Sequence, residues 1–136
     1  EAGARCLMGG KMPNDPGFFY PVTLLADVTP QMCAFKEETF GPVAVLVKAS
    51  DAEDALKLAN DTPYGLGAGI WTSAKRGEEM ARRIEAGQVA VNGIVKTDPR
   101  LPSGGIKKSG YGRELGPHGI REFVNAQQVW VGPAQG

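Results

Sequence analysis

The sequence predicts an α/β fold in which helices cover a parallel β-sheet. Two observations carry this prediction. Strand patterns and helix patterns alternate between residues 42 and 91, which is the order found in βαβ units. Residues 42–47 are apolar without interruption, as in a strand that is buried on both faces of a parallel sheet. A chain of 136 residues has room for one core of this kind.

The first part of the chain mixes extended segments with turns. Residues 5–8 form a short apolar run that Gly9-Gly10 ends, and they predict a strand. Residues 11–17 are rich in Pro, Asn, Asp and Gly, which is typical of turns. Aromatic and β-branched side chains at 18–28 predict a second extended segment, in which Pro21 favours an edge or a break.

Two helices with clear start signals separate the strands that follow. Ser50-Asp51 can cap a helix that carries apolar side chains at helical spacing and ends before Pro63. Residues 66–71 then predict a strand. A second helix, with a serine as its cap, is predicted at about 73–85, and residues 88–91 predict the next strand.

A long glycine-rich segment follows at residues 92–112. Loops of this length in a compact domain are usually functional. Residues 113–121 predict a short helix, and the apolar residues at 122–132 predict a terminal strand. The chain therefore divides into a main domain at 1–121 and a terminal strand with its tail at 122–136.

Composition excludes several classes of protein. The apolar fraction is 42% and the charged fraction 22%, so the chain is not of the disordered type. Fifteen basic and fifteen acidic side chains cancel, which argues against a nucleic-acid binder, and no apolar run is long enough for a membrane span. Cys6, Cys33 and His118 do not complete a zinc site, and two cysteines favour a reducing, cytoplasmic setting. The chain opens without an initiator Met, which indicates a piece of a longer protein.

The glycine-rich residues 102–116 raise the question of a phosphate site. A P-loop requires G-x-x-x-x-G-K-S/T, and Lys108-Ser109 lacks the glycine at the required place. The three glycines from Gly110 to Gly116 follow a loop, not a strand, and their spacing is one residue longer than the dinucleotide fingerprint. Both nucleotide motifs fail, so we favour a tight loop that packs closely against a neighbouring layer.

An acidic pair, Glu37-Glu38, stands two residues before Phe40 and ahead of the apolar run at 42–47. A carboxylate can accept two hydrogen bonds from a vicinal diol, and an adjacent ring can pack on a planar heterocycle. The alternative is a solvated loop that a turn closes. Spacing alone does not choose between the two interpretations.

For the other polar and aromatic candidates a structural role is favoured. A lone histidine without a nearby carboxylate is usually solvated, and so is a small group of basic side chains. Tryptophans in apolar strands usually lie in a core or an interface. We expect a surface position for His118, a solvated cluster of Lys107, Lys108 and Arg113, and core or interface positions for Trp71 and Trp130.

Several blocks of the sequence together resemble the aldehyde dehydrogenase superfamily. They are E-E-T-F-G-P-V at 37–43, Ala59-Asn60 with Tyr64-Gly65-Leu66, Val91-Asn92, and G-G-I-K-K-S-G at 104–110 with Gly112-Arg113-Glu114. The blocks occur in the family's order, cover nearly the whole chain, and resemble the C-terminal part of the catalytic domain. Within the family, D-P-R-L-P at 98–102, Y-G-R-E-L at 111–115 and H-G-I-R-E-F at 118–123 are similar to bacterial succinate-semialdehyde dehydrogenases.

The resemblance implies oxidation of an aldehyde to a carboxylate with NAD or NADP. In the family, a cysteine thiolate attacks the aldehyde, hydride passes to the nicotinamide, and a water activated by a glutamate hydrolyses the thioester. The nucleophile, the general base and the main dinucleotide site lie upstream of the matched blocks, so we expect no catalytic residue in this chain. Cys6 and Cys33 lack the nucleophile's context, and Cys6 is expected to be a small buried side chain.

The resemblance also implies which residues bind the cofactor and which segment joins the subunits of an oligomer. It implies that Glu38 binds the hydroxyls of the nicotinamide ribose and that Phe40 packs against the nicotinamide. Residues 122–132 match the strand through which family members form dimers and tetramers.

For the substrate, residues 92–101 match the loop that closes the aldehyde tunnel. Thr97 stands where related enzymes place a hydrogen-bond donor, which a substrate carboxylate needs. Ser103 offers a second hydroxyl, and Lys96 is the rival of Thr97. The family usually has Phe where this chain has Ser103, and the loss of that ring changes the shape and polarity of the tunnel.

Three hypotheses follow. The first is the C-terminal part of an oxidoreductase that takes a small aldehyde. The second is a structural or oligomerisation module without chemistry of its own. The third, a nucleotide-binding module built on the glycine-rich loop, is disfavoured because both phosphate motifs fail.

Overall fold

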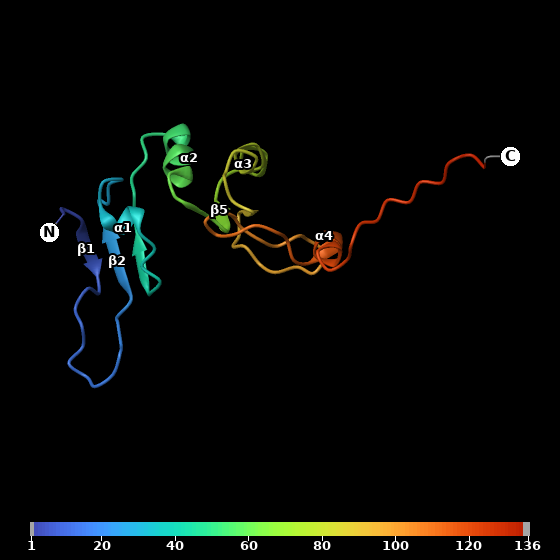
Figure 1. The fold of residues 1–136 in the computed structure, drawn as a ribbon. Coiled ribbons are helices and arrows are strands. Elements are labelled where there is room, and N and C mark those ends of the chain that lie inside the picture. Colours follow the sequence, from blue (N-terminus) through green and yellow to red (C-terminus); the bar gives the residue numbers. More distant parts are fainter. Residues whose placement is uncertain (1, 135–136) are drawn as a thin grey trace. The chain divides into compact units, whose positions relative to one another are not determined.

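The computed structural model describes residues 2–134 and divides into two compact units, Glu1–Thr62 and Pro63–Gly136. Both units combine strands with helices, as predicted, and each contains one parallel strand pair (Figure 1). The predicted α/β class is therefore confirmed, with the parallel pairs in two separate sheets.

The first unit is built on a three-stranded sheet with the order β1-β2-β3, made of β1 (Arg5–Met8), β2 (Thr23–Ala26) and β3 (Val43–Val45). β1 runs antiparallel to β2, and β2 runs parallel to β3 with Thr23 opposite Val43. A parallel pair needs a crossover, and the chain between β2 and β3 contains the short helix α1 (Cys33–Lys36). The sequence pattern gave no signal for this helix.

Helix α2 (Ala52–Asn60) begins where the sequence predicts it. The Asp51 carboxylate accepts a hydrogen bond from the Asp54 backbone N–H at 2.9 Å. In return the Asp54 carboxylate accepts from the Ser50 backbone N–H at 2.9 Å and from the Ser50 hydroxyl at 3.0 Å. These bonds, the backbone one foremost, hold the pKa of Asp54 below its usual value. The reciprocal cap satisfies donors that the first helical turn leaves open.

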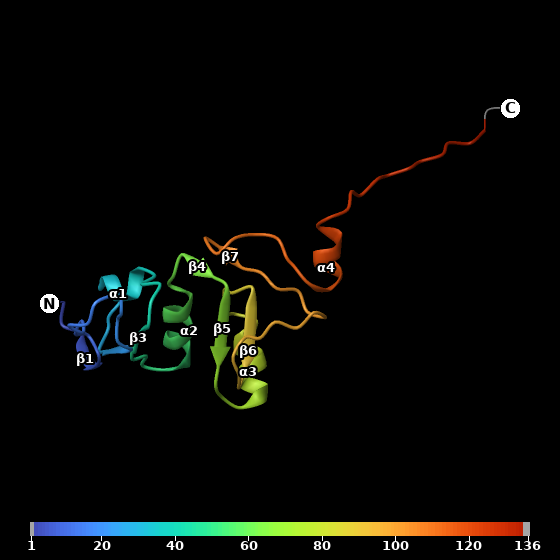
Figure 2. The same cartoon turned by 90° about the horizontal axis from the view of Figure 1, so that it is seen from below.

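The second unit centres on a βαβ element (Figure 2). β5 (Gly67–Ile70) and β6 (Gln88–Val91) are parallel and in register, with Gly67 opposite Gln88 and Ile70 opposite Val91. Helix α3 (Ala74–Ala81) connects them and contacts both strands. Gly77 lets the helix approach closely, because a Cβ there would collide with the Val91 side chain.

The rest of the second unit consists of β4 (Tyr64–Gly65), which precedes the βαβ element in the chain, and the residues after β6. β4 pairs antiparallel with β7 (Ile106–Lys107), which interrupts the segment predicted to be irregular. Helix α4 (Gly116–Arg121) is shorter than predicted, because Leu115 has a left-handed φ of 65°, which lies outside the right-handed helical region. Helix α3 likewise stops at Ala81, four residues before the predicted end.

Two predictions about burial are wrong. In β3, Val43 and Val45 are half-buried and Ala44 is exposed, so the strand is covered on one face and not on two. Cys6 is exposed and its thiol donates to the Met8 carbonyl oxygen at 3.3 Å, because all of β1 lies at the exposed edge of its sheet. The buried apolar side chains of the described residues are few: Ala26, Val28, Leu56 and Ile70.

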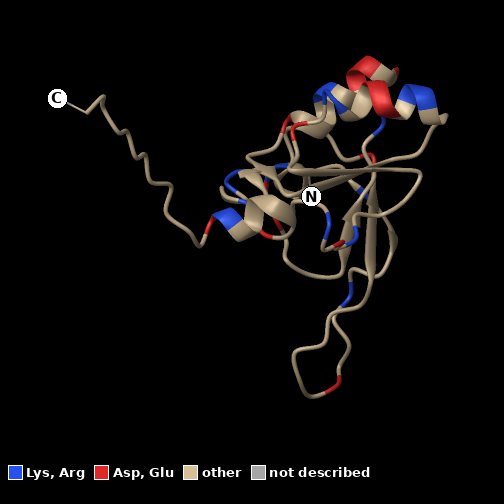
Figure 3. Ribbon diagram, turned by 90° about the vertical axis from the view of Figure 1, so that its right-hand side faces the viewer, with Lys and Arg blue, Asp and Glu red and all other residues tan. Residues whose placement is uncertain are grey.

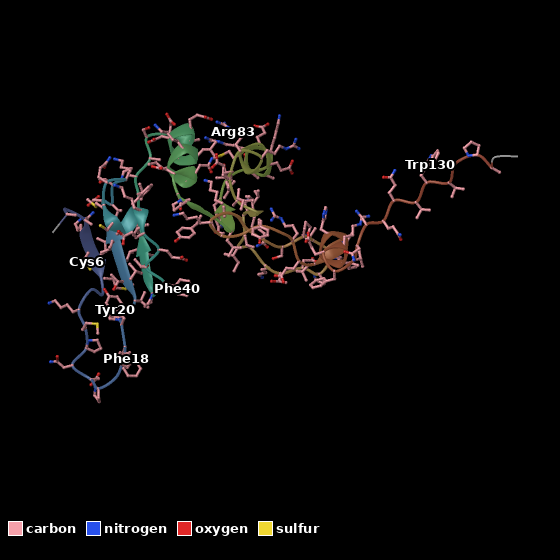
Figure 4. The ribbon with its side chains drawn as sticks, in the orientation of Figure 1. Cys6, Phe18, Tyr20, Phe40, Arg83 and Trp130 are labelled. Atoms are coloured by element: carbon pink, nitrogen blue, oxygen red, sulfur yellow. The ribbon has the colours of Figure 1, made fainter. Side chains whose placement is uncertain are left out.

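The predicted terminal strand at 122–132 is not formed within this chain. After α4 the described residues run as extended, exposed chain, and Trp130 is 79% exposed (Figures 1 and 4). A strand requires a hydrogen-bonding neighbour, and residues 2–134 supply none to this segment. Trp71 is also exposed, so neither tryptophan is a core residue of the described chain.

Charges of both signs are interspersed along helices α2 and α3 (Figure 3). This is the usual arrangement on solvent-facing helix surfaces. Among the described residues, no helix has the length and apolar character needed to cross a bilayer.

We expect Gly87→Ala to destabilise the second unit. A Cβ at Gly87 would collide with the carbonyl oxygen of Gly104 and lie 3.1 Å from the Gly105 Cα. Overpacking of this kind costs about 1–3 kcal/mol. The thermal unfolding midpoint of the purified protein should fall by several degrees. Gly93→Ala is the matched control, since a Cβ there meets nothing within 4 Å. Equal midpoints for the two variants would contradict the packing interpretation.

Candidate functional site

A cavity of about 610 Å³ lies in the second unit. One side is formed by β6 and the preceding Gly87, and the other by residues 94–98 and 101–103. The loop predicted to face the substrate therefore does line a cavity. Thr97 and Ser103 both belong to its wall, so the structure brings these two predicted residues together, and Lys96 lines it as well.

The loop leaves β6 through a turn fixed by Asn92. This residue has a left-handed φ of 55°, which Asn tolerates better than most side chains. Its side-chain oxygen accepts from the Thr72 N–H at 2.9 Å, and its amide nitrogen donates to the Thr72 carbonyl at 2.8 Å. The two bonds continue the pairing of β5 and β6 by one step and set the direction in which the loop starts.

Asp98 and Arg100 form a clamp at the cavity wall that sequence reasoning missed. The Arg100 backbone N–H and Nε each donate to one Asp98 carboxylate oxygen at 2.9 Å, and Nη2 donates to the other at 2.6 Å. The side-chain bonds from Arg100, followed by the backbone one, hold the pKa of Asp98 below its usual value. The sequence signal was Asp followed by Pro and a donor two residues on, which is the pattern of an Asx turn.

The glycine-rich loop is held by Arg113, in contrast to the prediction of a solvated cluster. One guanidinium nitrogen of Arg113 donates to the carbonyls of Gly105 at 2.8 Å and Gly112 at 2.6 Å. Lys107 pairs with Glu85 at 2.5 Å. The loop is packed closely, as predicted, and a Cβ at Gly105 would lie 2.6 Å from the Ser109 Cβ. Carbonyl oxygens, not N–H groups, face the guanidinium, so this part of the loop does not suit a phosphate.

Glu38 and Phe40 lie in the first unit, in the loop between α1 and β3. Phe40 is 91% exposed, and Figure 4 shows its ring projecting from the sheet. Its left-handed φ of 45° turns the chain three residues before the start of β3. Glu38 is exposed and makes no hydrogen bond or ion pair within residues 2–134. An open carboxylate beside an open ring is chemically suited to a diol and a planar ring, and the contact of this pair with the nicotinamide end of NAD(P) stays a prediction.

The two cysteines are free and exposed. Both line a cavity of about 540 Å³ in the first unit, together with Met32 and Tyr20. Among residues 2–134, no three His, Cys, Asp or Glu side chains gather into a group that could hold a metal ion. His118 is exposed, as predicted.

Proteins with similar sequences are known. Succinate semialdehyde dehydrogenase [NAD(P)+] of Escherichia coli is 52% identical over 129 residues, which cover 94% of this chain and 28% of that protein. Succinate-semialdehyde dehydrogenase [NADP(+)] of Mycobacterium leprae is 49% identical over 131 residues, covering 96% of this chain and 29% of that protein. The chain thus spans less than a third of the curated relatives it matches.

A solved structure shares the fold along nearly the whole chain. The NAD+ complex of an aldehyde dehydrogenase from Bacillus cereus superposes with a TM-score of 0.90 and 38% identity, and covers 97% of this chain and 27% of that one. The sequence model that describes the aldehyde dehydrogenase family matches residues 1–129 of this chain. With a match that extends over nearly every residue, this chain belongs to the aldehyde dehydrogenase family.

Proposed function

We propose that this chain is the C-terminal part of an NAD(P)-dependent aldehyde dehydrogenase that oxidises succinate semialdehyde to succinate. The observation that carries the proposal is the cavity beside β6, whose wall combines Thr97, Ser103 and Lys96. Two hydroxyls and an ammonium group are donors suited to a carboxylate. The relatives named above are succinate-semialdehyde dehydrogenases, which supports the same substrate.

Each half of the chain has its own task in this proposal. Glu38 accepts hydrogen bonds from the ribose hydroxyls, and Phe40 offers a flat apolar surface to the nicotinamide. NAD or NADP, when bound, supplies the hydride acceptor. Thr97 and Ser103 hold the distal carboxylate of the substrate, with Lys96 as the alternative donor.

The nucleophile, the general base and the main dinucleotide site belong, in this proposal, to the part of the enzyme before Glu1. Neither Cys6 nor Cys33 is paired with a histidine or a carboxylate that would activate it in the described chain. Residues 122–132 pair with another subunit and build a dimer or tetramer. The enzyme works in the cytoplasm, without nucleic-acid or membrane partners.

The alternative function is a structural or oligomerisation module without catalysis. It is favoured by the apolar side chains that the described residues leave exposed, among them Phe123, Trp130 and Val131. Apolar faces of this kind mark interaction surfaces. The experiment that follows separates the two functions.

The complete protein that contains this chain should reduce NAD or NADP in the presence of succinate semialdehyde, followed at the absorbance of the reduced nicotinamide. The 136-residue chain by itself should show no turnover. An inactive complete protein would favour the module. Turnover by the 136-residue chain that is lost in Cys33→Ala would instead place the nucleophile within this segment.

Glu38→Gln in the complete enzyme should raise the KM for the cofactor or slow hydride transfer. The two charge-assisted hydrogen bonds at stake contribute about 1.5–3 kcal/mol each, and the neutral amide retains only part of that. Glu37→Gln is the matched control, one residue away in the same exposed loop. Unchanged kinetics in the Glu38 variant would remove the ribose contact.

Thr97→Val should penalise succinate semialdehyde more than an uncharged aldehyde. The change removes the hydroxyl and keeps the side-chain volume, so that a carboxylate loses a donor worth about tenfold in kcat/KM. Ser103→Ala tests the second hydroxyl in the same assay. Equal losses for charged and uncharged aldehydes would show that the loop does not recognise the carboxylate.

A further inference from the structure

The charge on the wall of the cavity beside β6 raises a question that the proposed function leaves open. An anionic substrate would have to bind next to Asp98, which lines the same cavity as Thr97 and Lys96. Hydrogen bonds from Arg100 hold the pKa of Asp98 low, so this carboxylate is ionised at neutral pH. Like charges brought together in a site disfavour binding. A carboxylate on the wall therefore needs compensation.

Arg100 supplies that compensation from outside the cavity. Its side chain is 85% exposed, whereas that of Asp98 is 28% exposed, so the guanidinium lies on the solvent side of the pair. Nε and Nη2 engage both carboxylate oxygens at 2.9 and 2.6 Å. A bidentate bond of this type fixes the orientation of the carboxylate as well as its charge.

The turn that carries the pair is tied at several points. The Arg100 N–H donates to the Asp98 side chain at 2.9 Å, and the Leu101 N–H donates to the Asp98 carbonyl at 3.0 Å. The Gly116 N–H, at the start of α4, donates to the Pro99 carbonyl at 3.0 Å. The backbone of residues 98–101 is thus held by bonds that do not involve the guanidinium. Loss of the Arg100 side chain would remove the two guanidinium bonds to the Asp98 carboxylate and leave its bond to the Arg100 backbone N–H, and most of the turn, in place.

We propose that Arg100 determines substrate charge specificity as a positioning residue: it holds and neutralises Asp98, so that the cavity beside β6 accepts an aldehyde that carries a distal carboxylate. This inference rests on the proposed function and deepens it. Without the guanidinium, the Asp98 charge at the cavity wall is no longer compensated, so Asp98 competes with the substrate carboxylate for the Lys96 ammonium group or repels the substrate. An uncharged aldehyde does not experience this effect.

The test compares KM and kcat of the complete enzyme for succinate semialdehyde and for butanal, which has the same number of carbons and no carboxylate. Arg100→Met should raise the KM for succinate semialdehyde about tenfold, the equivalent of one charge-assisted hydrogen bond, and leave kcat nearly unchanged. The KM for butanal should change less than twofold. Arg100→Lys should give an intermediate value, because lysine keeps the charge and loses the bidentate geometry.

The double variant Asp98→Asn with Arg100→Met isolates the charge. The asparagine oxygen can still accept from the backbone N–H of residue 100, so the turn is retained and the uncompensated charge is removed. The KM for succinate semialdehyde should return to within about twofold of the value for Asp98→Asn alone. Arg76→Met, an exposed arginine on α3, controls for loss of a surface charge.

Each outcome decides a different point. A KM that rises equally for both aldehydes in Arg100→Met would mean that Arg100 only supports the loop, and it would overturn the inference. Unchanged KM values, or a double variant that is not rescued, would do the same. A wild-type enzyme that does not prefer succinate semialdehyde to butanal would refute the proposed substrate itself, whatever the variants do. Thermal midpoints verify that each variant is folded.

Discussion

The second unit depends on the close approach of two backbones, at Gly87 before β6 and at Gly104 in the glycine-rich loop. A side chain at Gly87 has no room beside the Gly104 carbonyl. The Gly87 N–H also donates to the Gly65 carbonyl at 3.0 Å. This bond joins the strand pair β5–β6 to the strand pair β4–β7. One glycine therefore seats the loop on the sheet, and the position of the cavity wall follows from it.

Further hydrogen bonds hold the segments on either side of this contact, which form part of the cavity wall. Ser103 and Glu114 exchange two backbone hydrogen bonds of 2.8 Å, and Arg113 binds the carbonyls of Gly105 and Gly112. The turn at 98–101 is joined to the start of α4. Binding residues are commonly carried by loops on a rigid scaffold. Here Ser103 is bonded through its own backbone to Glu114, and Thr97 directly precedes the bonded turn at 98–101, which reduces the ordering that a substrate would have to impose at this wall.

The sequence predicted best what is determined locally. The cap at Asp51, the strands at 5–8 and 88–91 and the helix between β5 and β6 depend on residues close in sequence, and all are present. The role of Arg113 was missed because its partners are carbonyl oxygens, which every residue type carries and no motif reveals. The Asp98–Arg100 clamp was detectable from its Asx-turn spacing. The family resemblance, in turn, placed the loop at 92–101, and the structure finds a cavity there.

Predictions that depend on contact with other elements are less reliable than the local ones. An uninterrupted apolar run predicts a strand that is buried on both faces. The pattern shows that both faces are apolar, but it does not identify the segment that covers each of them. Ala44 is exposed because the described chain covers only one face of β3. The same holds for residues 122–132, whose apolar side chains and open backbone groups suit a strand but find no neighbour within residues 2–134. Burial is a property of a pair of surfaces, so a sequence pattern can specify one of them and leave the other open.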